Sequence, residues 1–201
     1  MIMGVRMMGK ILGSLNSAIA LGVALLLVVM FGLHFHVMDA AYAVPVLVFL
    51  HVLSGIVWIG LLYYFNLVQI PTMPKVPAEL KGGVSKFIAP EALWWFRWGA
   101  IATLVTGLGV AGHKGYLIEA FTLRPGFATI GVGMYIAIIM AANVWMIIWP
   151  NQQRALGLVP ADDATKAASA RTAMLASRTN FVLSFPMLYA MVTQLYLGGA
   201  V

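Results

Sequence analysis

The stretch AIALGVALLLVVM, residues 18–30, indicates the fold class of this protein. It lies within a mostly apolar run, residues 11–35, that holds no acidic residue, lysine or arginine. About 20 apolar residues in a helix span the ~30 Å hydrocarbon core of a bilayer. Four more runs approach this length, at about residues 44–70, 92–112, 127–149 and 180–197. The sequence therefore predicts an all-α polytopic membrane protein, an antiparallel bundle of about five transmembrane helices that forms a single membrane domain over residues 1–201.

The composition supports lipid as the solvent of most of the chain. Apolar residues make up 62% of it and charged residues 9%, whereas a soluble domain carries about 25% charged residues. The net charge of +6 does not indicate nucleic-acid binding, because basic residues of membrane proteins collect in cytoplasmic loops. The absence of cysteine excludes disulfides, thiolate metal sites, iron–sulfur clusters and covalent c-type haem within these residues.

Prolines are expected to end two of the helices. Pro71 follows the second apolar run, and Pro74 and Pro77 are expected to prevent the helix from restarting. Pro150 follows the fourth run in the same way. Proline lacks the backbone N–H and its ring clashes with the preceding turn, so it favours a helix end at these places.

Lysine and arginine are distributed unequally between the two sides of the predicted bundle. With a cytoplasmic N-terminus, the inner side holds Arg6, Lys10, Lys75, Lys81, Lys86, Arg97, Arg154, Lys166, Arg171 and Arg178, whereas the outer side holds Lys114 and Arg124. This bias follows the positive-inside rule. We therefore expect a bacterial inner-membrane protein with its N-terminus in the cytoplasm and its C-terminus in the periplasm.

A cleavable signal peptide is the alternative interpretation of the N-terminal residues. Arg6 and Lys10, the apolar run and the segment Ala41-Tyr42-Ala43, with a small residue on each side of the tyrosine, are typical of such a segment. The apolar run is longer than the usual 7–15 residues, which favours an uncleaved first helix.

His51 is the strongest candidate for a functional side chain. It lies about one third of the way into the second predicted helix from its outer end, where an ionisable group is unfavourable unless it is paired or liganded. Ser54, Gly55 and Trp58 follow at spacings that place them on the same helix face. Ser54 and Gly55 are small enough to let that face approach another helix or a flat ring. The alternative is a neutral histidine that hydrogen bonds a carbonyl across the bundle.

The other three histidines, His34, His36 and His113, lie at helix ends on the same outer side. Imidazole is the usual protein ligand of haem iron, copper and zinc. The pattern predicts haem b in the outer half, or copper as the alternative, with His51 and His113 as candidate cofactor ligands and His34 and His36 as further candidate metal ligands. His51 is expected about 10 Å deeper than His113, so joint ligation requires tilted helices or a longer third helix. His34 and His36 are alternatively interfacial residues at a helix end.

A second polar set lies toward the inner ends of the predicted helices and comprises Asn66, Arg97, Asn143, Arg178 and Asn180. Asn143 falls within the lipid span, where an unpaired amide is unfavourable. One interpretation is hydrogen bonding between helices together with helix capping. The other is a pocket that faces the cytoplasm and binds an anion or a quinone head group.

Several motifs occur in order along residues 43–195. They are His51-x-x-Ser54-Gly55-Ile56-Val57-Trp58-Ile59-Gly60 with Tyr63-Tyr64-Phe65-Asn66 and Pro71, Trp94-Trp95-Phe96-Arg97-Trp98-Gly99, Asn143-Val144-Trp145, Trp149-Pro150-Asn151-Gln152, and Ser177-Arg178-Thr179-Asn180 with Ser184-x-Pro186. Together these motifs resemble the membrane domain of the bacterial urate oxidase N-terminal family. The segment from His51 to Gly60 is also similar, more weakly, to the copper-resistance membrane family.

The resemblance implies a redox function. In the fused members of the family, this membrane domain precedes a c-type cytochrome domain and is linked to the oxidation of urate to 5-hydroxyisourate. The resemblance therefore implies a domain that passes electrons to a cytochrome c on the outer side. The 201 residues include no cytochrome domain and no cysteine, so it implies a stand-alone form whose electrons leave through a separate partner.

Three functions remain open from the sequence. The first is a membrane redox module that holds haem b, or a metal, at His51 and passes electrons to a periplasmic or membrane-bound cytochrome or oxidase. The second is a non-catalytic accessory subunit of a larger membrane complex. The third is urate oxidation with an external cytochrome c, in which the inner polar set binds the anion.

Overall fold

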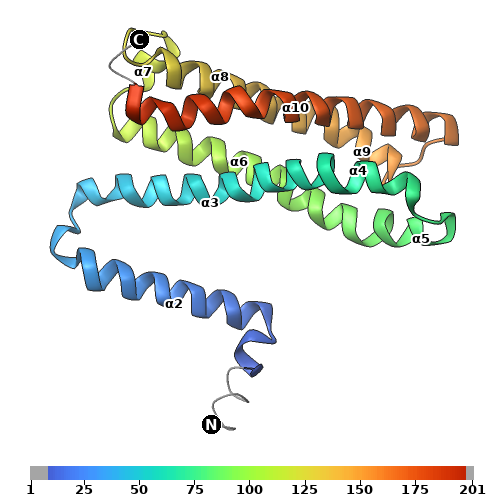
Figure 1. Cartoon of the computed structure of the whole chain (residues 1–201), viewed down its shortest axis with the longest axis horizontal. Helices are drawn as coiled ribbons and strands as arrows, with labels where there is room; N and C mark the ends of the chain where they lie inside the picture. Colours follow the sequence, from blue (N-terminus) through green and yellow to red (C-terminus); the bar gives the residue numbers. More distant parts are fainter. Residues whose placement is uncertain (1–8, 198–201) are drawn as a thin grey trace. The chain divides into compact units, whose positions relative to one another are not determined.

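The computed structural model describes residues 9–197, which divide between two compact units, residues 1–43 and 44–201 (Figure 1). The first unit contains α2 (Leu15–His34) and two short 3₁₀ turns, Phe35–Val37 and Ala40–Tyr42. The helix α2 agrees with the predicted apolar run. The prediction of a single membrane domain stays a prediction, and Arg6 and the C-terminal residues 198–201 lie outside the described residues.

The second unit is a bundle of four long helices, each antiparallel to the one before it (Figure 1). These are α3 (Ala43–Tyr63), α6 (Ala89–His113), α8 (Ala128–Asn143) and α10 (Asp163–Leu197). The connecting segments contain the short helices α4 (Ile70–Thr72), α5 (Ala78–Gly83), α7 (Leu117–Phe121) and α9 (Trp149–Ala155). No strand occurs in the described residues, and the all-α prediction is confirmed. Below, the outer end is the one that holds α7 and the end of α10.

The number of membrane spans is approximate. Four helical runs in the described residues are long and apolar enough to cross a membrane, namely Leu15–Val37, Ala40–Lys75, Ala128–Ala155 and Asp163–Leu197. The predicted span at residues 92–112 is a helix, α6, but it does not join this set. It contains Arg97 and several glycines and tryptophans, which lower its hydropathy. It also has nine buried residues, so much of its surface faces protein instead of lipid.

The prediction that Pro71 and Pro150 end their helices was wrong. The second helical run continues through α4 to Lys75, and the fourth continues through α9 to Ala155. Each proline follows a π-helical segment: η3 (Tyr64–Gln69) precedes Pro71 and η6 (Val144–Ile148) precedes Pro150. The wider π turn moves the carbonyl with which the proline ring would clash in a regular α-helix.

The third helical run starts earlier than its predicted boundary at residue 92. The segment η5 (Val84–Ile88) is a third π-helical turn and precedes Pro90 in the same way. Helix α5 begins directly after Pro77, although that proline was expected to prevent a restart. Proline is compatible with a helix start because the first turn leaves its N–H groups unbonded in any case.

Helix α10 begins at Asp163 and not near residue 180 as predicted. Its first half is polar and was therefore excluded from the hydropathy pattern, but it is rich in alanine, which has the highest helix propensity. Asp162 precedes the helix and accepts a hydrogen bond from the backbone N–H of Thr165 at 2.6 Å. This bond lowers the pKa of the Asp162 carboxyl, so the cap is the ionised carboxylate.

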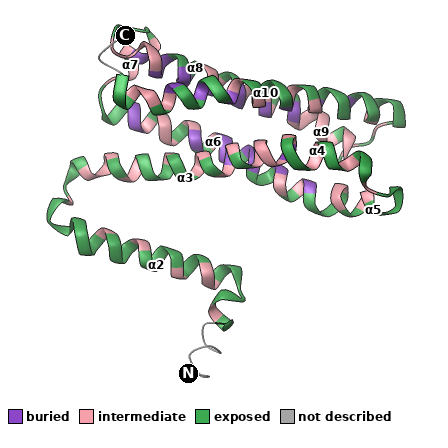
Figure 2. Ribbon diagram, viewed as in Figure 1, coloured by how far each residue is buried: buried purple, intermediate pink, exposed green. Residues whose placement is uncertain are grey.

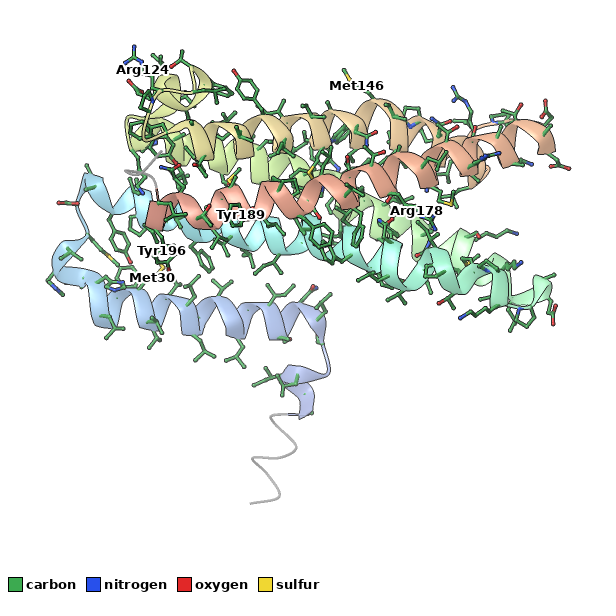
Figure 3. All side chains as sticks on the ribbon, turned by 45° about the horizontal axis from the view of Figure 1, so that its top comes forward. Met30, Arg124, Met146, Arg178, Tyr189 and Tyr196 are labelled. Carbon is green, nitrogen blue, oxygen red and sulfur yellow. The ribbon has the colours of Figure 1, made fainter. Side chains whose placement is uncertain are left out.

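The bundle core lies between α3, α6, α8 and α10. Trp58, Leu62, Phe96 and Met140 are its largest fully buried apolar side chains. Figure 2 shows the buried residues on the inward faces of these helices, with exposed residues on the outward faces. The outward faces are strongly apolar, as for Met146, which points away from the bundle (Figure 3). Such a surface fits a lipid environment, because a soluble protein rarely exposes large apolar patches.

Candidate functional site

The His51 side chain is fixed by a neighbouring helix. Its Nδ1 lies 2.9 Å from the backbone carbonyl oxygen of Thr103 on α6. A carbonyl oxygen only accepts, so Nδ1 carries the proton and donates it, and Thr106 Oγ1 lies 3.5 Å away as a weaker neighbour. In the neutral imidazole this leaves the lone pair on Nε2, for which no hydrogen bond occurs among the described residues. A histidine anchored in this way presents Nε2 as a ligand.

Gly107 provides the space for this imidazole. A Cβ atom at Gly107 would lie 2.8 Å from His51 Cε1 and 3.0 Å from Nδ1, closer than side chains pack. The residue lies one helical turn after Thr103, whose carbonyl accepts the His51 proton. Thr103 and Gly107 thus form a seat on α6 that holds the ring in one orientation.

His51 lies on the wall of a cavity of about 640 Å³ between the four long helices, open on the side lined by the exposed residues Val52, Ile56 and Val192. This volume is within the ~300–1,000 Å³ typical of small-molecule and cofactor sites. The walls come from all four long helices and are almost entirely apolar. Three methionine side chains, Met134 on α8 and Met187 and Met191 on α10, also line it. The cavity is suited to a large apolar ligand that His51 can bind at one point.

Two of the neighbours predicted for His51 line the cavity and one does not. Gly55 and Trp58 belong to the wall. Trp58 is fully buried, and its indole Nε1–H has no hydrogen-bond partner within the described part of the chain. Ser54 is absent from the wall, and its hydroxyl donates to the carbonyl oxygen of Leu50 in its own helix.

Within the four-helix unit, His113 does not line the cavity. His113 is exposed at the outer end of α6, and its Nδ1 lies 2.9 Å from the carbonyl oxygen of Gly109 in the same helix. It follows Gly107 by six residues, a rotation of about 120° away from the His51 seat at 100° per residue. In the first unit, His34 and His36 are both exposed, and His34 Nδ1 lies 3.0 Å from the hydroxyl oxygen of Tyr42. The described residues contain no group of three or more histidine, aspartate or glutamate side chains arranged to hold a metal.

The predicted inner polar set separates into two pairings and two single residues. Asn143 Nδ2 donates to Asn180 Oδ1 at 2.7 Å, and Asn180 Nδ2 donates to the Met140 carbonyl. Asn66 Nδ2 donates to Ser177 Oγ at 2.9 Å. These bonds join η3, α8 and α10, as expected for polar contacts between membrane helices.

The two arginines of that set differ in their surroundings. Arg178 is exposed on α10. Arg97 is buried on α6, and its guanidinium carbon lies 3.3 Å from the ring centroid of Trp149. Arg97 therefore packs with aromatic residues, and in the described residues no hydrogen bond joins it to the asparagines.

Sequence reasoning missed the residues that complete the cavity. Thr103 and Gly107 share one face of α6, because they are four residues apart, and this spacing was the available signal. Which of the glycines of that helix faces His51 depends on the rotation of α6 against α3, which no local pattern contains. The methionines of α8 and α10 look like ordinary apolar core residues in the sequence.

Part of the chain matches a known protein family. Residues 111–198 match the family model described as urate oxidase N-terminal. This match confirms the predicted resemblance over that part of the chain, which includes the motifs from Asn143 onward. The segments around His51 and Arg97 precede it. No curated protein and no solved structure matches the chain, and the similarity to the copper-resistance membrane family stays a prediction.

Proposed function

From the premise that residues 111–198 match the urate oxidase N-terminal family, we propose that this membrane protein is a redox module that holds haem b at His51. The observation that carries the proposal is the anchoring of His51 by the Thr103 carbonyl beside a large apolar cavity. Haem iron takes an imidazole nitrogen as ligand, and the porphyrin needs apolar walls. The cavity supplies both.

The residues on the wall fit this group in three respects. His51 presents Nε2 with its lone pair, Gly107 keeps the ring in place, and the unpartnered Trp58 Nε1–H is available to an acceptor. Bound haem b would supply one-electron transfer between two iron oxidation states. The Thr103 carbonyl raises the basicity of the imidazole through Nδ1, and the walls around the ligand bond are almost entirely apolar.

Copper is the alternative occupant. Thioether sulfur and imidazole nitrogen together suit copper, and Met134, Met187 and Met191 line the wall that holds His51. The large apolar volume favours haem, because a bare ion would leave most of the cavity empty.

An absorption spectrum with metal analysis of the purified protein tests the proposal. Haem b gives a Soret band and stoichiometric iron, whereas copper without a Soret band supports the alternative occupant. A colourless protein that carries neither metal, purified from cells with adequate haem and copper supply, overturns both.

Replacing Gly107 by alanine is expected to reduce haem retention to below about half, because overpacking of this size costs ~1–3 kcal/mol. The added methyl group would overlap His51 Cε1 at 2.8 Å. Gly112→Ala on the same helix is the matched control, since a Cβ there meets nothing within 4 Å. The haem-to-protein absorbance ratio measures the effect. Equal ratios in the two variants contradict the role of Gly107.

We further propose that electrons leave toward a separate cytochrome, or a larger membrane complex, at the outer end. This proposal rests on the place of the His51 cavity, which lies in the outer half of the bundle. The family description also makes urate a candidate electron donor. Reduction of added cytochrome c by membranes that contain the protein, with and without urate, tests the donor and the exit together.

The proposed orientation places the outer end in the periplasm of a bacterial inner membrane, on the basis of the lysine and arginine bias. Because the chain has no cysteine, single cysteines can report it. In intact cells, Lys114→Cys at the outer end is expected to react with a membrane-impermeant maleimide, and Arg171→Cys only after lysis. The reverse pattern of labelling would show the opposite orientation.

A further inference from the structure

Arg97 is a buried cation without a counter-ion in the described residues. Its exposed fraction is 8%. The ion pairs among the described residues are Arg124–Glu119 and Lys166–Asp163, and neither involves it. Its Nε and Nη1 atoms are buried without a hydrogen-bond partner. An arginine stays charged in proteins, and a buried charge is strongly unfavourable unless it is paired.

Aromatic rings surround the guanidinium without satisfying its N–H groups. The guanidinium carbon lies 3.3 Å from the ring centroid of Trp149 and 5.9 Å from that of Trp145. These cation–π contacts attract the charge and fix the plane of the guanidinium against Trp149. The N–H donors lie in that plane, so they need an acceptor beside the rings.

Unpartnered polar atoms of other residues lie at the same level of the bundle. Asn66 Oδ1, Gln69 Oε1 and Asn143 Oδ1 are buried acceptors, and Trp145 Nε1 is a buried donor. The ring centroids of Phe65 and Phe96 lie 5.5 Å apart. Phe65 directly precedes Asn66 in the chain, and Phe96 directly precedes Arg97. This contact places the level of Asn66 next to that of Arg97. Buried polar groups are normally satisfied, so several unsatisfied atoms at one level indicate a missing polar ligand.

The depth of this level corresponds to the inner membrane interface. Arg97 precedes the outer end of α6, His113, by 16 residues, which is about 24 Å at 1.5 Å per residue. The hydrocarbon core of a bilayer is about 30 Å thick. Trp94, Trp95 and Trp98 are exposed on the same part of α6, as in the aromatic belt at lipid headgroups. Arg97 is therefore within reach of headgroup phosphates.

We propose that Arg97 binds a phosphate-type oxyanion, the headgroup of an anionic phospholipid or a free phosphate, at the inner end of the bundle. Phosphate oxygens accept from the guanidinium in its plane, and headgroup hydroxyls, or waters beside the anion, donate to the amide oxygens. Basic pockets between membrane helices on the cytoplasmic side recognise such headgroups. The site is separate from the His51 cavity and does not depend on its occupant.

Thermal unfolding of the purified full-length protein tests the site. The protein in neutral detergent is titrated with dioleoylphosphatidylglycerol in mixed micelles. Dioleoylphosphatidylcholine, which has no net charge, is the comparison lipid. Sodium phosphate is titrated separately at constant ionic strength. Saturable stabilisation by phosphatidylglycerol is expected. Arg97→Gln weakens the apparent affinity about tenfold or more, the range of a lost charged hydrogen bond. Arg171→Gln, an exposed arginine of α10 outside the inner polar set, is the matched control and leaves it unchanged.

The lipid and phosphate titrations also distinguish the two sources of the oxyanion. If only phosphate gives saturable stabilisation, the ligand is a free anion; if only phosphatidylglycerol does, the ligand is the lipid. In both cases, loss of that stabilisation in Arg97→Gln supports the site. If Arg97→Gln does not fold, Arg97→Lys keeps the charge but loses the planar donors, and the same weakening is expected. Stabilisation of the wild-type protein by neither ligand, or equal stabilisation of the wild type and the Arg97 variants, overturns the proposal.

Discussion

Replacing His51 by alanine is expected to remove the Soret band of the purified protein entirely, while His113→Ala leaves it in place. His51 is the only histidine on the wall of the described cavity, and alanine has no nitrogen to replace Nε2. His113 is exposed at the end of the same bundle and bonds to its own helix. The measurement is the Soret absorbance per protein, with circular dichroism to confirm that both variants keep their helix content.

Two results contradict this expectation. A Soret band that survives in His51→Ala places the haem ligand elsewhere. A band lost equally in both variants would favour ligation by the predicted His51–His113 pair, which the separate hydrogen bonds of the two rings do not support. His51→Gln is a useful third variant, because its amide preserves much of the volume but is a poor iron ligand.

Gly131→Ala is expected to destabilise the bundle by about 3 kcal/mol or more, at the upper end of overpacking effects. A Cβ atom at this position of α8 would overlap the carbonyl oxygen of Ala120 on α7, and would lie 2.7 Å from Leu123 Cδ2. Backbone atoms cannot move aside as a flexible side chain can. Thermal unfolding in detergent, followed by tryptophan fluorescence, measures the loss.

Gly60→Ala provides the control for that experiment. A Cβ at Gly60 meets nothing within 4 Å, and alanine is favoured over glycine within a helix by roughly 0.5–1 kcal/mol. This variant should therefore be as stable as the wild type or slightly more stable. If Gly131→Ala unfolds at the same temperature as Gly60→Ala, α7 does not pack against α8 as the structure indicates.

The sequence was sufficient for features that depend on local composition. Apolar runs of membrane length indicated the helices, because hydropathy depends only on the local sequence. Helix ends were less predictable. A proline ends a regular helix, but the π-helical turns η3 and η6 allow each run to continue. Neither the apolar runs nor the prolines of the sequence indicate a π turn.

The candidate sites could be predicted only in part. His51 was recognisable because an ionisable residue in an apolar run needs a partner. Its partners on α6, Thr103 and Gly107, depend on how two helices are rotated against each other. Arg97 was grouped with Asn143 and Asn180 because all three lie at a similar depth, yet the asparagines bond to each other, whereas Arg97 stacks on Trp149.

The π-helical turns η3 and η6 change the direction in which the following side chains point around the helix axis. One extra residue in a helical turn rotates everything beyond it by about 100°. Asn66 lies within η3 and Trp145 within η6, so residues farther inward on these two runs are out of phase with the cavity wall. A one-residue insertion or deletion at these turns would therefore turn the inner residues toward new neighbours without rotating His51.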